Sequence, residues 1–322
     1  MRIVTCYPIE NRHLQQLRAV APGHEVVDAW PDRITHEILH ADVFLGHAKV
    51  PVPWDEVVKQ GRLQWIQSSA AGMDHCLVPS VIASQILVTS ASGLFADPVA
   101  EQTLALTLGL LRGLPTFFRA QQKREFIRRP TRDLHQATVG ILGLGGNGRR
   151  IAETLAPFRC RIIATDLVPY DRPPTVEQLL PADALDELLP QVDILILCVP
   201  LNDQTVGMID AHRLAQMKRG ALIINVARGP VVRECDLVAA LESGQLAGAG
   251  LDVTEVEPLP TDSLLWDHPH VLITPHVGAQ SVRRADVTTD FLAANLARYV
   301  AGQPLVNVVD KQLGFPRRLA QS

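Results

Sequence analysis

Three short polar segments late in the chain carry residue types that could do chemistry. Each follows an apolar run that is typical of a β-strand: NVARG at 225–229, LDVTEVEPLP at 251–260 and TPHVG at 274–278. Open α/β sheets bind ligands at the carboxyl ends of their parallel strands. An arginine placed by a glycine turn, as Arg228 would be, can bind a carboxylate through two parallel hydrogen bonds. The alternative is a surface arginine that caps a loop.

His276 would add a proton donor and acceptor. Imidazole exchanges protons near neutral pH, which suits an enzyme that moves a hydride to or from a carbonyl carbon. A nearby carboxylate would orient the ring, and the second segment offers Asp252, Glu255 and Glu257. Acidic loop residues are usually solvated and a single histidine is more often structural. Spacing alone does not choose among the three acids.

A glycine-rich stretch earlier in the chain indicates a nucleotide. Residues 138–150, TVGILGLGGNGRR, are typical of a strand, a glycine turn and a helix. Gly143 would make the tight turn, Gly145 would admit a pyrophosphate, and Gly148 would let the helix pack on its strand. The amides at the helix start would face the anion. Such a turn also arises wherever a chain needs a positive φ.

Asp166 ends the next apolar run, roughly 20 residues after the glycines, where an acid accepts a hydrogen bond from a ribose 2′-hydroxyl. Its carboxylate would repel a 2′-phosphate, and Leu167 and Val168 bring no positive charge. We therefore expect NAD, with NADP the less favoured cofactor. Arg172 lies close enough in sequence to keep NADP open.

Alternating strands and helices must position these residues. In the first region, strands are expected at Arg2–Tyr7, Glu25–Val27, Val43–Gly46, Leu63–Gln67 and Gln85–Thr89. In the later region, six runs suit a doubly wound sheet: Thr138–Leu142, Arg161–Thr165, Asp193–Val199, Ala221–Val226, Ala247–Leu251 and Val271–Thr274. Helical patterns lie between them, and a last helix is expected near Ser281–Ala301.

Composition bounds the function. The chain has 322 residues, a net charge of −4 and 47% hydrophobic residues, which suggests two ordinary globular domains. We expect neither nucleic acid nor a membrane as partner, because there is no basic excess and no apolar run of about 20 residues. Five scattered cysteines without C-x-x-C spacing predict free thiols in the cytoplasm and no metal site.

Taken in order, these motifs resemble the D-isomer-specific 2-hydroxyacid dehydrogenases. That NAD(P)-dependent family includes glycerate, hydroxypyruvate/glyoxylate and phosphoglycerate dehydrogenases. The resemblance covers essentially the whole chain and rests on GLGGNG, Asp166, NVARG, the run from AGAGLDV to EPLP, and TPHVG. It implies reversible hydride transfer between NAD(H) and a short 2-hydroxy or 2-oxo acid.

The resemblance also assigns roles to residues. His276 would be the general acid–base, Glu257 rather than Glu255 its partner, and Arg228 the ligand of the substrate's carboxylate and carbonyl. The loop Ala70, Ala71, Gly72 and Met73 would cradle that carboxylate. Cofactor contacts would come from Gly143, Gly145, Gly146, Asn147, Gly148, Asp166, Val226, Ala227, Asp252 and Gly278. Asn147 stands where the family often has an apolar residue.

The implied architecture is two Rossmann-like or flavodoxin-like α/β domains, each a parallel sheet covered by helices, with the active-site cleft between them. Residues 1–96 and 285–322 would form a discontinuous substrate domain, and residues 97–284 the NAD-binding domain. A homodimer is implied as well. The alternative is an NAD-sensing dimeric scaffold like the transcriptional co-repressors of the same fold, which also keep the three catalytic residues.

Overall fold

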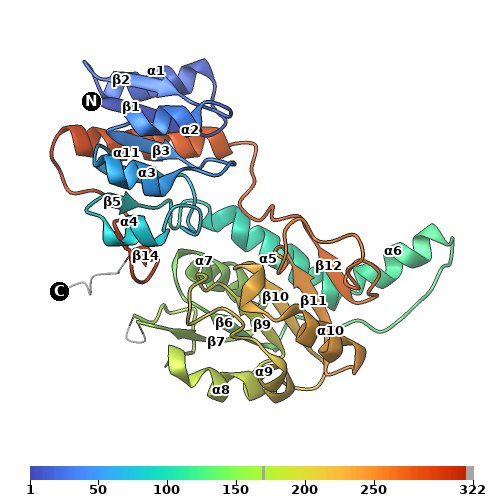
Figure 1. Cartoon of the computed structure of the whole chain (residues 1–322). Helices are drawn as coiled ribbons and strands as arrows, with labels where there is room; N and C mark the ends of the chain where they lie inside the picture. The colour runs from blue at the N-terminus through green and yellow to red at the C-terminus, as the bar shows by residue number, and fades with distance from the viewer. Residues whose placement is uncertain (169–170, 317–322) are drawn as a thin grey trace. The chain divides into compact units, whose positions relative to one another are not determined.

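The computed structural model describes residues 1–168 and 171–316. The chain forms two compact units (Figure 1). Unit 1 contains Met1–Leu94 together with the segment from Ser281 onward, and unit 2 is Phe95–Gln280. Among the described residues, no helix is both long and apolar enough to cross a membrane.

Unit 1 is built on a five-stranded parallel sheet in the order β2-β1-β3-β4-β5. Its strands are β1 (Arg2–Cys6), β2 (Glu25–Asp28), β3 (Val43–Gly46), β4 (Trp65–Ser68) and β5 (Leu87–Thr89). Its helices are α1 (Asn11–Val20), α2 (Ile34–Glu37), η1 (Ile38–His40), α3 (Trp54–Gln60), α4 (Pro79–Ala83) and α11 (Arg284–Val300). A small antiparallel pair, β13 (Val309–Asp310) and β14 (Phe315–Pro316), lies near the end of the described chain.

Successive side chains of each strand in unit 1 point to opposite faces of the sheet, and helices cover both faces. Ile3 packs in the core formed with Leu17 of α1 and Leu292 of α11. Its neighbour Val4 packs in the opposite core with Trp54 of α3. A parallel sheet needs this cover on both faces.

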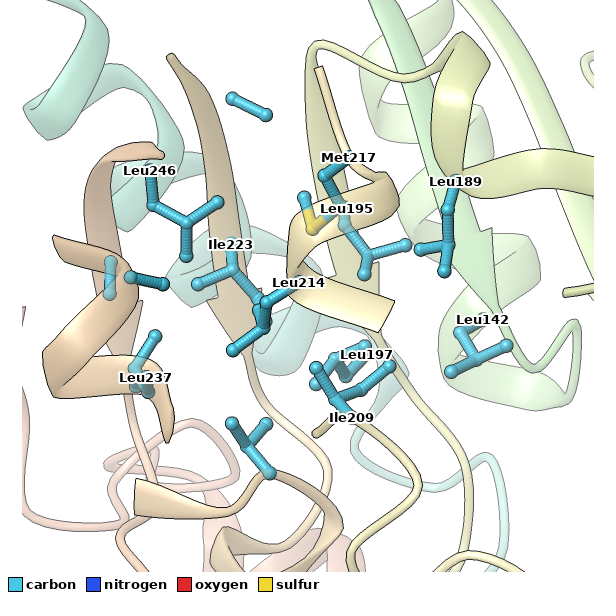
Figure 2. Close-up of a cluster of buried hydrophobic side chains, with 14 of the residues drawn as sticks. Leu142, Leu189, Leu195, Leu197, Ile209, Leu214, Met217, Ile223, Leu237 and Leu246 are labelled. Carbon is cyan, nitrogen blue, oxygen red and sulfur yellow. The ribbon is translucent and has the colours of Figure 1, made fainter. Parts of the chain in front are cut away.

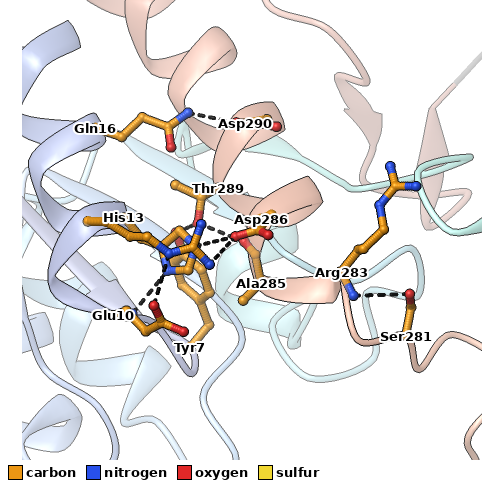
Figure 3. A network of polar contacts seen from close by, with 11 residues as sticks. Tyr7, Glu10, His13, Gln16, Ser281, Arg283, Ala285, Asp286, Thr289 and Asp290 are labelled. Atoms are coloured by element: carbon orange, nitrogen blue, oxygen red, sulfur yellow. Dashed lines mark hydrogen bonds and ion pairs between the residues drawn. The ribbon is translucent and has the colours of Figure 1, made fainter.

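Polar contacts fasten α11 to the first helix of unit 1 (Figure 3). The His13 ring is buried, and its Nδ1 accepts from the backbone N–H of Glu10 at 3.0 Å. The proton of the neutral ring is therefore on Nε2, which donates to Asp286 of α11 at 2.8 Å. The Tyr7 hydroxyl lies 3.0 Å from that of Thr289. These bonds hold a segment more than 250 residues distant in sequence against the start of the chain.

Unit 2 is built on a seven-stranded parallel sheet in the order β12-β11-β10-β9-β6-β7-β8. Its strands are β6 (Thr138–Leu142), β7 (Arg161–Asp166), β8 (Gln178–Pro181), β9 (Ile194–Leu197), β10 (Ala221–Asn225), β11 (Leu246–Leu251) and β12 (Val271–Ile273). Its α-helices are α5 (Ala96–Leu111), α6 (Leu114–Gln122), α7 (Gly146–Leu155), α8 (Leu185–Leu188), α9 (Ala211–Gln216) and α10 (Glu234–Glu242), with short 3-10 turns η2 (Ala156–Phe158), η3 (Ala182–Ala184), η4 (Leu189–Gln191) and η5 (Gly229–Val231).

Both faces of this sheet are also covered. Figure 2 shows one core, in which Leu195 and Ile223 of the sheet meet Leu214 of α9 and Leu237 of α10. On the other face, Ile194 and Ile224 pack with residues of α5 and α7. The predicted fold class, helix-covered parallel sheets in an α/β chain, is confirmed.

One strand of unit 2 was not predicted from the sequence. The six expected runs correspond to six strands, but β8 adds a seventh at the edge of the sheet beside β7. The reason is that its sequence, QLLP, is short and its side chains are only partly buried. A strand at a sheet edge has one neighbour, so it shows a weak apolar signal.

Candidate active site

Three neighbouring strands bring the polar segments to one edge of the unit 2 sheet. β10, β11 and β12 are parallel and adjacent, with Asn225 opposite Leu251 and Leu251 opposite Ile273. The segments 225–229, 251–260 and 274–278 therefore all begin at the carboxyl ends of these strands. That is the edge at which open α/β sheets bind ligands.

His276 and Glu257 form a hydrogen-bonded pair at this edge. The Nδ1 of His276 lies 2.8 Å from Oε2 of Glu257. A carboxylate only accepts, so Nδ1 carries the shared proton and Nε2 is the ring atom left for a substrate. Both side chains are partly exposed, at 46% and 39%. Glu255 points elsewhere, because its Oε2 accepts from the backbone N–H of Glu234 at 2.9 Å.

Asp252 holds the backbone at His276 and at the two residues that follow it. Asp252 is only 3% exposed, and its backbone carbonyl accepts from the N–H of His276 at 2.7 Å. Its side chain accepts from the N–H of Val277 at 3.0 Å and from the N–H of Gly278 at 2.8 Å. His276 has a φ of +53°, which is uncommon for a residue other than glycine. Asp252 therefore fixes the strained turn that carries the histidine.

The same carboxylate is linked to α5 through a third donor. The Thr274 hydroxyl donates to Oδ1 of Asp252 at 2.6 Å and accepts from the Gln102 side-chain amide at 2.8 Å. Gly278 has no room for a side chain here, since a Cβ would lie 2.7 Å from Oδ2 of Asp252. The sequence alone predicted no role for Gln102, or for Thr274 within the segment 274–278.

Arg228 is positioned by a turn that Asn225 and Gly229 define. The buried Asn225 side chain donates to the carbonyl of Arg228 at 3.0 Å and accepts from the N–H of Ala227 at 3.0 Å. At Gly229 a Cβ would lie 1.7 Å from the carbonyl oxygen of Thr254. Only glycine lets the Arg228 turn come this close to the segment that carries Glu257. Val226 is half-buried and Ala227 buried within the turn.

The glycine loop after β6 has the shape of an anion cradle. Gly143 has a φ of +92°, and at Gly148 a Cβ would lie 2.1 Å from the Gly143 carbonyl oxygen, so both positions require glycine. At Gly145, by contrast, a Cβ would meet no atom within 4 Å. The space over Gly145 is thus left for a ligand, and Gly146 begins α7, whose first amides face it.

Asn147 and Asp166 flank this cradle. Asn147 is half-buried in the first turn of α7, and its side chain has no hydrogen-bond partner within residues 1–168 and 171–316. Asp166 ends β7 and accepts from the N–H of Leu144 at 2.6 Å and from the N–H of Val168 at 2.9 Å. A carboxylate has about four acceptor positions, so Asp166 keeps capacity for a ribose hydroxyl. The residues present fit a dinucleotide.

The Ala70–Met73 loop lies in unit 1, directly after β4. The N–H of Ala70 donates to the Ser68 hydroxyl at 3.0 Å. The N–H groups of Ala71, Gly72 and Met73 make no hydrogen bond within the described part of the chain. Consecutive unpaired amides of this kind form an anion-binding nest. Within residues 1–168 and 171–316, no cluster of three or more histidine, cysteine or acidic side chains is arranged to hold a metal ion.

Comparisons with known proteins agree with this geometry. A family model described as D-isomer specific 2-hydroxyacid dehydrogenase, NAD binding domain, matches residues 104–278. A glyoxylate reductase of Thermofilum pendens is 32% identical over 304 residues, covering 90% of this chain and 88% of the relative. A glycerate dehydrogenase of Methylorubrum extorquens is 30% identical, covering 89% and 91%. The chain spans 56% of the length of a 30% identical D-3-phosphoglycerate dehydrogenase of Mycobacterium tuberculosis.

Solved structures are similar along almost the whole chain. A D-isomer specific 2-hydroxyacid dehydrogenase of Xanthobacter autotrophicus, solved with NADPH and MES, has a TM-score of 0.80 and 31% identity, and covers 97% of this chain and 99% of its own. An NADPH-dependent glyoxylate/hydroxypyruvate reductase of Sinorhizobium meliloti, solved with NADP and sulfate, has a TM-score of 0.82 and 28% identity, covering 98% and 99%. The chain therefore belongs to the D-isomer-specific 2-hydroxyacid dehydrogenase family, whose members are nicotinamide-dependent oxidoreductases.

Proposed function

We propose that the protein reversibly transfers a hydride between a nicotinamide cofactor and a short 2-hydroxy or 2-oxo acid. The observation that carries this proposal is the 2.8 Å pair of His276 and Glu257 on the sheet edge that also carries Arg228. Imidazole supported by a carboxylate suits proton exchange with an alcohol or carbonyl oxygen. A guanidinium on the same sheet edge suits a carboxylate. The names of the relatives favour an enzyme over the NAD-sensing scaffold.

In the reductive direction, Arg228 binds the substrate's carboxylate. The amides of Ala71 and Gly72, in unit 1, suit the same anionic group. A nicotinamide cofactor held by the glycine loop and Asp166 would supply the hydride for C2 of the oxo acid, or accept it in the oxidative direction. As charge develops on the C2 oxygen, Nε2 of His276 gives up its proton to it. Glu257 accepts the Nδ1 hydrogen bond throughout, so it fixes the ring's orientation and stabilises its protonated form.

We also propose that NAD is preferred to NADP, and the support is electrostatic. The carboxylate of Asp166 would stand beside a 2′-phosphate and repel it. Arg149 forms an ion pair with Asp171 at 2.7 Å, and Arg172 donates to the Val176 carbonyl, so both guanidinium groups have partners within the protein. The two solved relatives described above hold NADPH or NADP, so the proposed preference departs from them and rests on the carboxylate of Asp166. A higher kcat/KM with NADPH than with NADH would overturn it.

A substrate screen tests the proposed reaction. Glyoxylate, hydroxypyruvate, pyruvate and bulkier 2-oxo acids are each offered with NADH and with NADPH, and cofactor oxidation is followed by absorbance. We expect turnover of at least one short 2-oxo acid and faster turnover with NADH. Absence of turnover with every acid, while NADH still binds, would instead support the scaffold.

We further propose a cytoplasmic homodimer. Its support is an apolar surface on and after α6, where Phe118 is 55% and Phe126 is 92% exposed beside Leu114 and Ile127. Exposed apolar patches of this kind mark protein–protein contacts. Light scattering of the wild type should give twice the chain mass, and Phe118→Ser should shift the mass toward the monomer. A monomeric wild type at assay concentration would refute the dimer. All five cysteines are free thiols, as a reducing compartment favours.

A further inference from the structure

Two histidines of unit 1 lie stacked at the carboxyl ends of adjacent strands. His47 directly follows β3, and His75 lies in the loop after β4, whose last residue Ser68 is opposite Gly46. Their ring centroids are 3.9 Å apart, with 26° between the ring planes. The pair takes no part in the reaction described above, although it occupies the ligand-binding edge of its sheet.

Hydrogen bonds connect this pair to the Ala70–Met73 loop. The Ser68 hydroxyl accepts from the N–H of Ala70 at 3.0 Å, and it lies 3.2 Å from Nε2 of His75. The backbone carbonyl of His75 accepts from the Trp54 indole at 3.0 Å, which fixes that end of the loop. The His47 ring is therefore connected to the Ala70–Met73 loop, the proposed carboxylate cradle, through its stacking on His75 and through the Ser68 hydroxyl. C3 of a short 2-oxo acid is only two bonds from the carboxylate carbon, and a substituent on C3 is three bonds from it.

The His47 ring has unused hydrogen-bonding capacity. Its backbone N–H donates to Cys6, but the ring itself has no hydrogen-bond partner in the described ranges 1–168 and 171–316. The pKa of His47 is lowered to about 3, mainly by burial and in addition by the positive charges of His75, Lys49 and Arg284, against the opposing charge of Asp74. The ring is thus neutral at any ordinary assay pH, and offers one N–H donor and one nitrogen acceptor.

A hydroxyl group matches this environment better than a charged group or a methyl group. A hydroxyl can both donate and accept a hydrogen bond, whereas an anionic group on C3, in addition to the carboxylate, would lose its hydration beside the half-buried His47 ring. A methyl group would leave the imidazole without a partner, which costs about 1–3 kcal/mol for a buried polar group.

We propose that His47, held by its stacking on His75, is a specificity-determining residue that selects 2-oxo acids with a hydroxyl on C3 over their methyl analogues. This inference rests on the proposed function. It assigns the enzyme's preference for the substrate's C3 substituent to the loops after β3 and β4. It predicts a higher kcat/KM for hydroxypyruvate than for pyruvate, two acids that differ only in that hydroxyl.

The test measures kcat/KM for hydroxypyruvate, pyruvate and glyoxylate in the wild type and in His47→Phe, which keeps a ring to stack on His75. The wild type should prefer hydroxypyruvate to pyruvate by about 10–100-fold, the range that one unmatched buried hydrogen bond gives. His47→Phe should remove most of that preference and leave glyoxylate, which has no C3, unchanged. His47→Asn, which keeps a donor and an acceptor, should restore part of it.

His40→Phe is the matched control, because His40 precedes β3 at the opposite edge of the same sheet and is exposed. It should leave all three values unchanged. His47→Leu repeats the test with a smaller side chain if the phenylalanine lowers the melting temperature. An unchanged hydroxypyruvate-to-pyruvate ratio in both variants, or a wild type without that preference, overturns the inference while the proposed reaction stands. A wild type that reduces none of the three acids overturns the proposed reaction itself.

Discussion

Replacing Asp252 with asparagine tests how the site is held. Oδ1 accepts from the Thr274 hydroxyl and the Val277 N–H, and Oδ2 accepts from the Gly278 N–H. Asparagine has one acceptor oxygen, so in either orientation of the amide its NH₂ group faces a backbone N–H. The side chain is 3% exposed, so water does not replace the lost bond. The turn that carries His276 would then lose one of its fixed points.

The size of the effect follows from these contacts. One buried N–H without a partner costs about 1–3 kcal/mol, and each kcal/mol lowers the melting temperature of a domain this size by about 2–4 °C. We expect that loss of stability together with a fall in kcat of roughly 10–100-fold, because a catalytic group displaced by about 1 Å can lose that much. Calorimetry and a steady-state assay on the best 2-oxo acid measure the two quantities.

Gln102→Leu and Thr274→Val separate positioning from direct contact with the cofactor, since the observed bonds of both residues lead to Asp252. Each should lower kcat more than it changes the affinity for NADH, and the double variant should lose less than the sum of the two, because they act through one carboxylate. Unchanged melting temperature and kcat in Asp252→Asn would refute the reasoning.

Two further predictions follow from local geometry. Gly145→Val should raise the KM for NADH without lowering the melting temperature, because the space over Gly145 is open. Gly148→Ala should lower both stability and activity, because its Cβ would lie 2.1 Å from the Gly143 carbonyl oxygen. An equal loss of stability in the two variants, measured by calorimetry, would contradict this prediction. The hydrogen bond from His13 lowers the pKa of Asp286 against the opposing effect of burial, and the Arg12 guanidinium lowers it as well. The contribution of the Asp286 carboxylate to stability is therefore present above the unfolded pKa of about 3.9 and is lost as pH falls through the folded pKa. Asp286→Asn should therefore be less stable than the wild type at pH 7 and approach it in acid, and thermal melts with a constant difference across that range would count against the assignment.

Much of the fold could be predicted because the central strands are buried on both faces. β9, for example, alternates Ile194 and Leu195 between two cores, which gives an uninterrupted apolar run. Edge strand β8 has no such run, and it was missed for that reason.

The candidate site was predictable where glycines and polar residues mark the ends of strands. The choice of Glu257 over Glu255 came from the family resemblance, and the structure brings Glu257 to the histidine. The contact of Gln102 with Thr274 and the stacking of His47 on His75 join residues from separate segments. Local sequence spacing does not predict contacts of this kind, because they depend on which segments lie side by side in the folded chain. The role of Asn225 in holding the Arg228 turn could have been predicted, since an asparagine side chain commonly bonds to the backbone two or three residues later.

The most direct test of the account is His276→Ala assayed on the best 2-oxo acid, with NADH affinity measured separately by fluorescence titration. If Nε2 of His276 delivers the proton to the C2 oxygen, kcat should fall on the order of 10²–10⁴-fold, and the dissociation constant for NADH should stay the same. Near-normal turnover in this variant would contradict the central claim that the His276–Glu257 pair is the general acid–base.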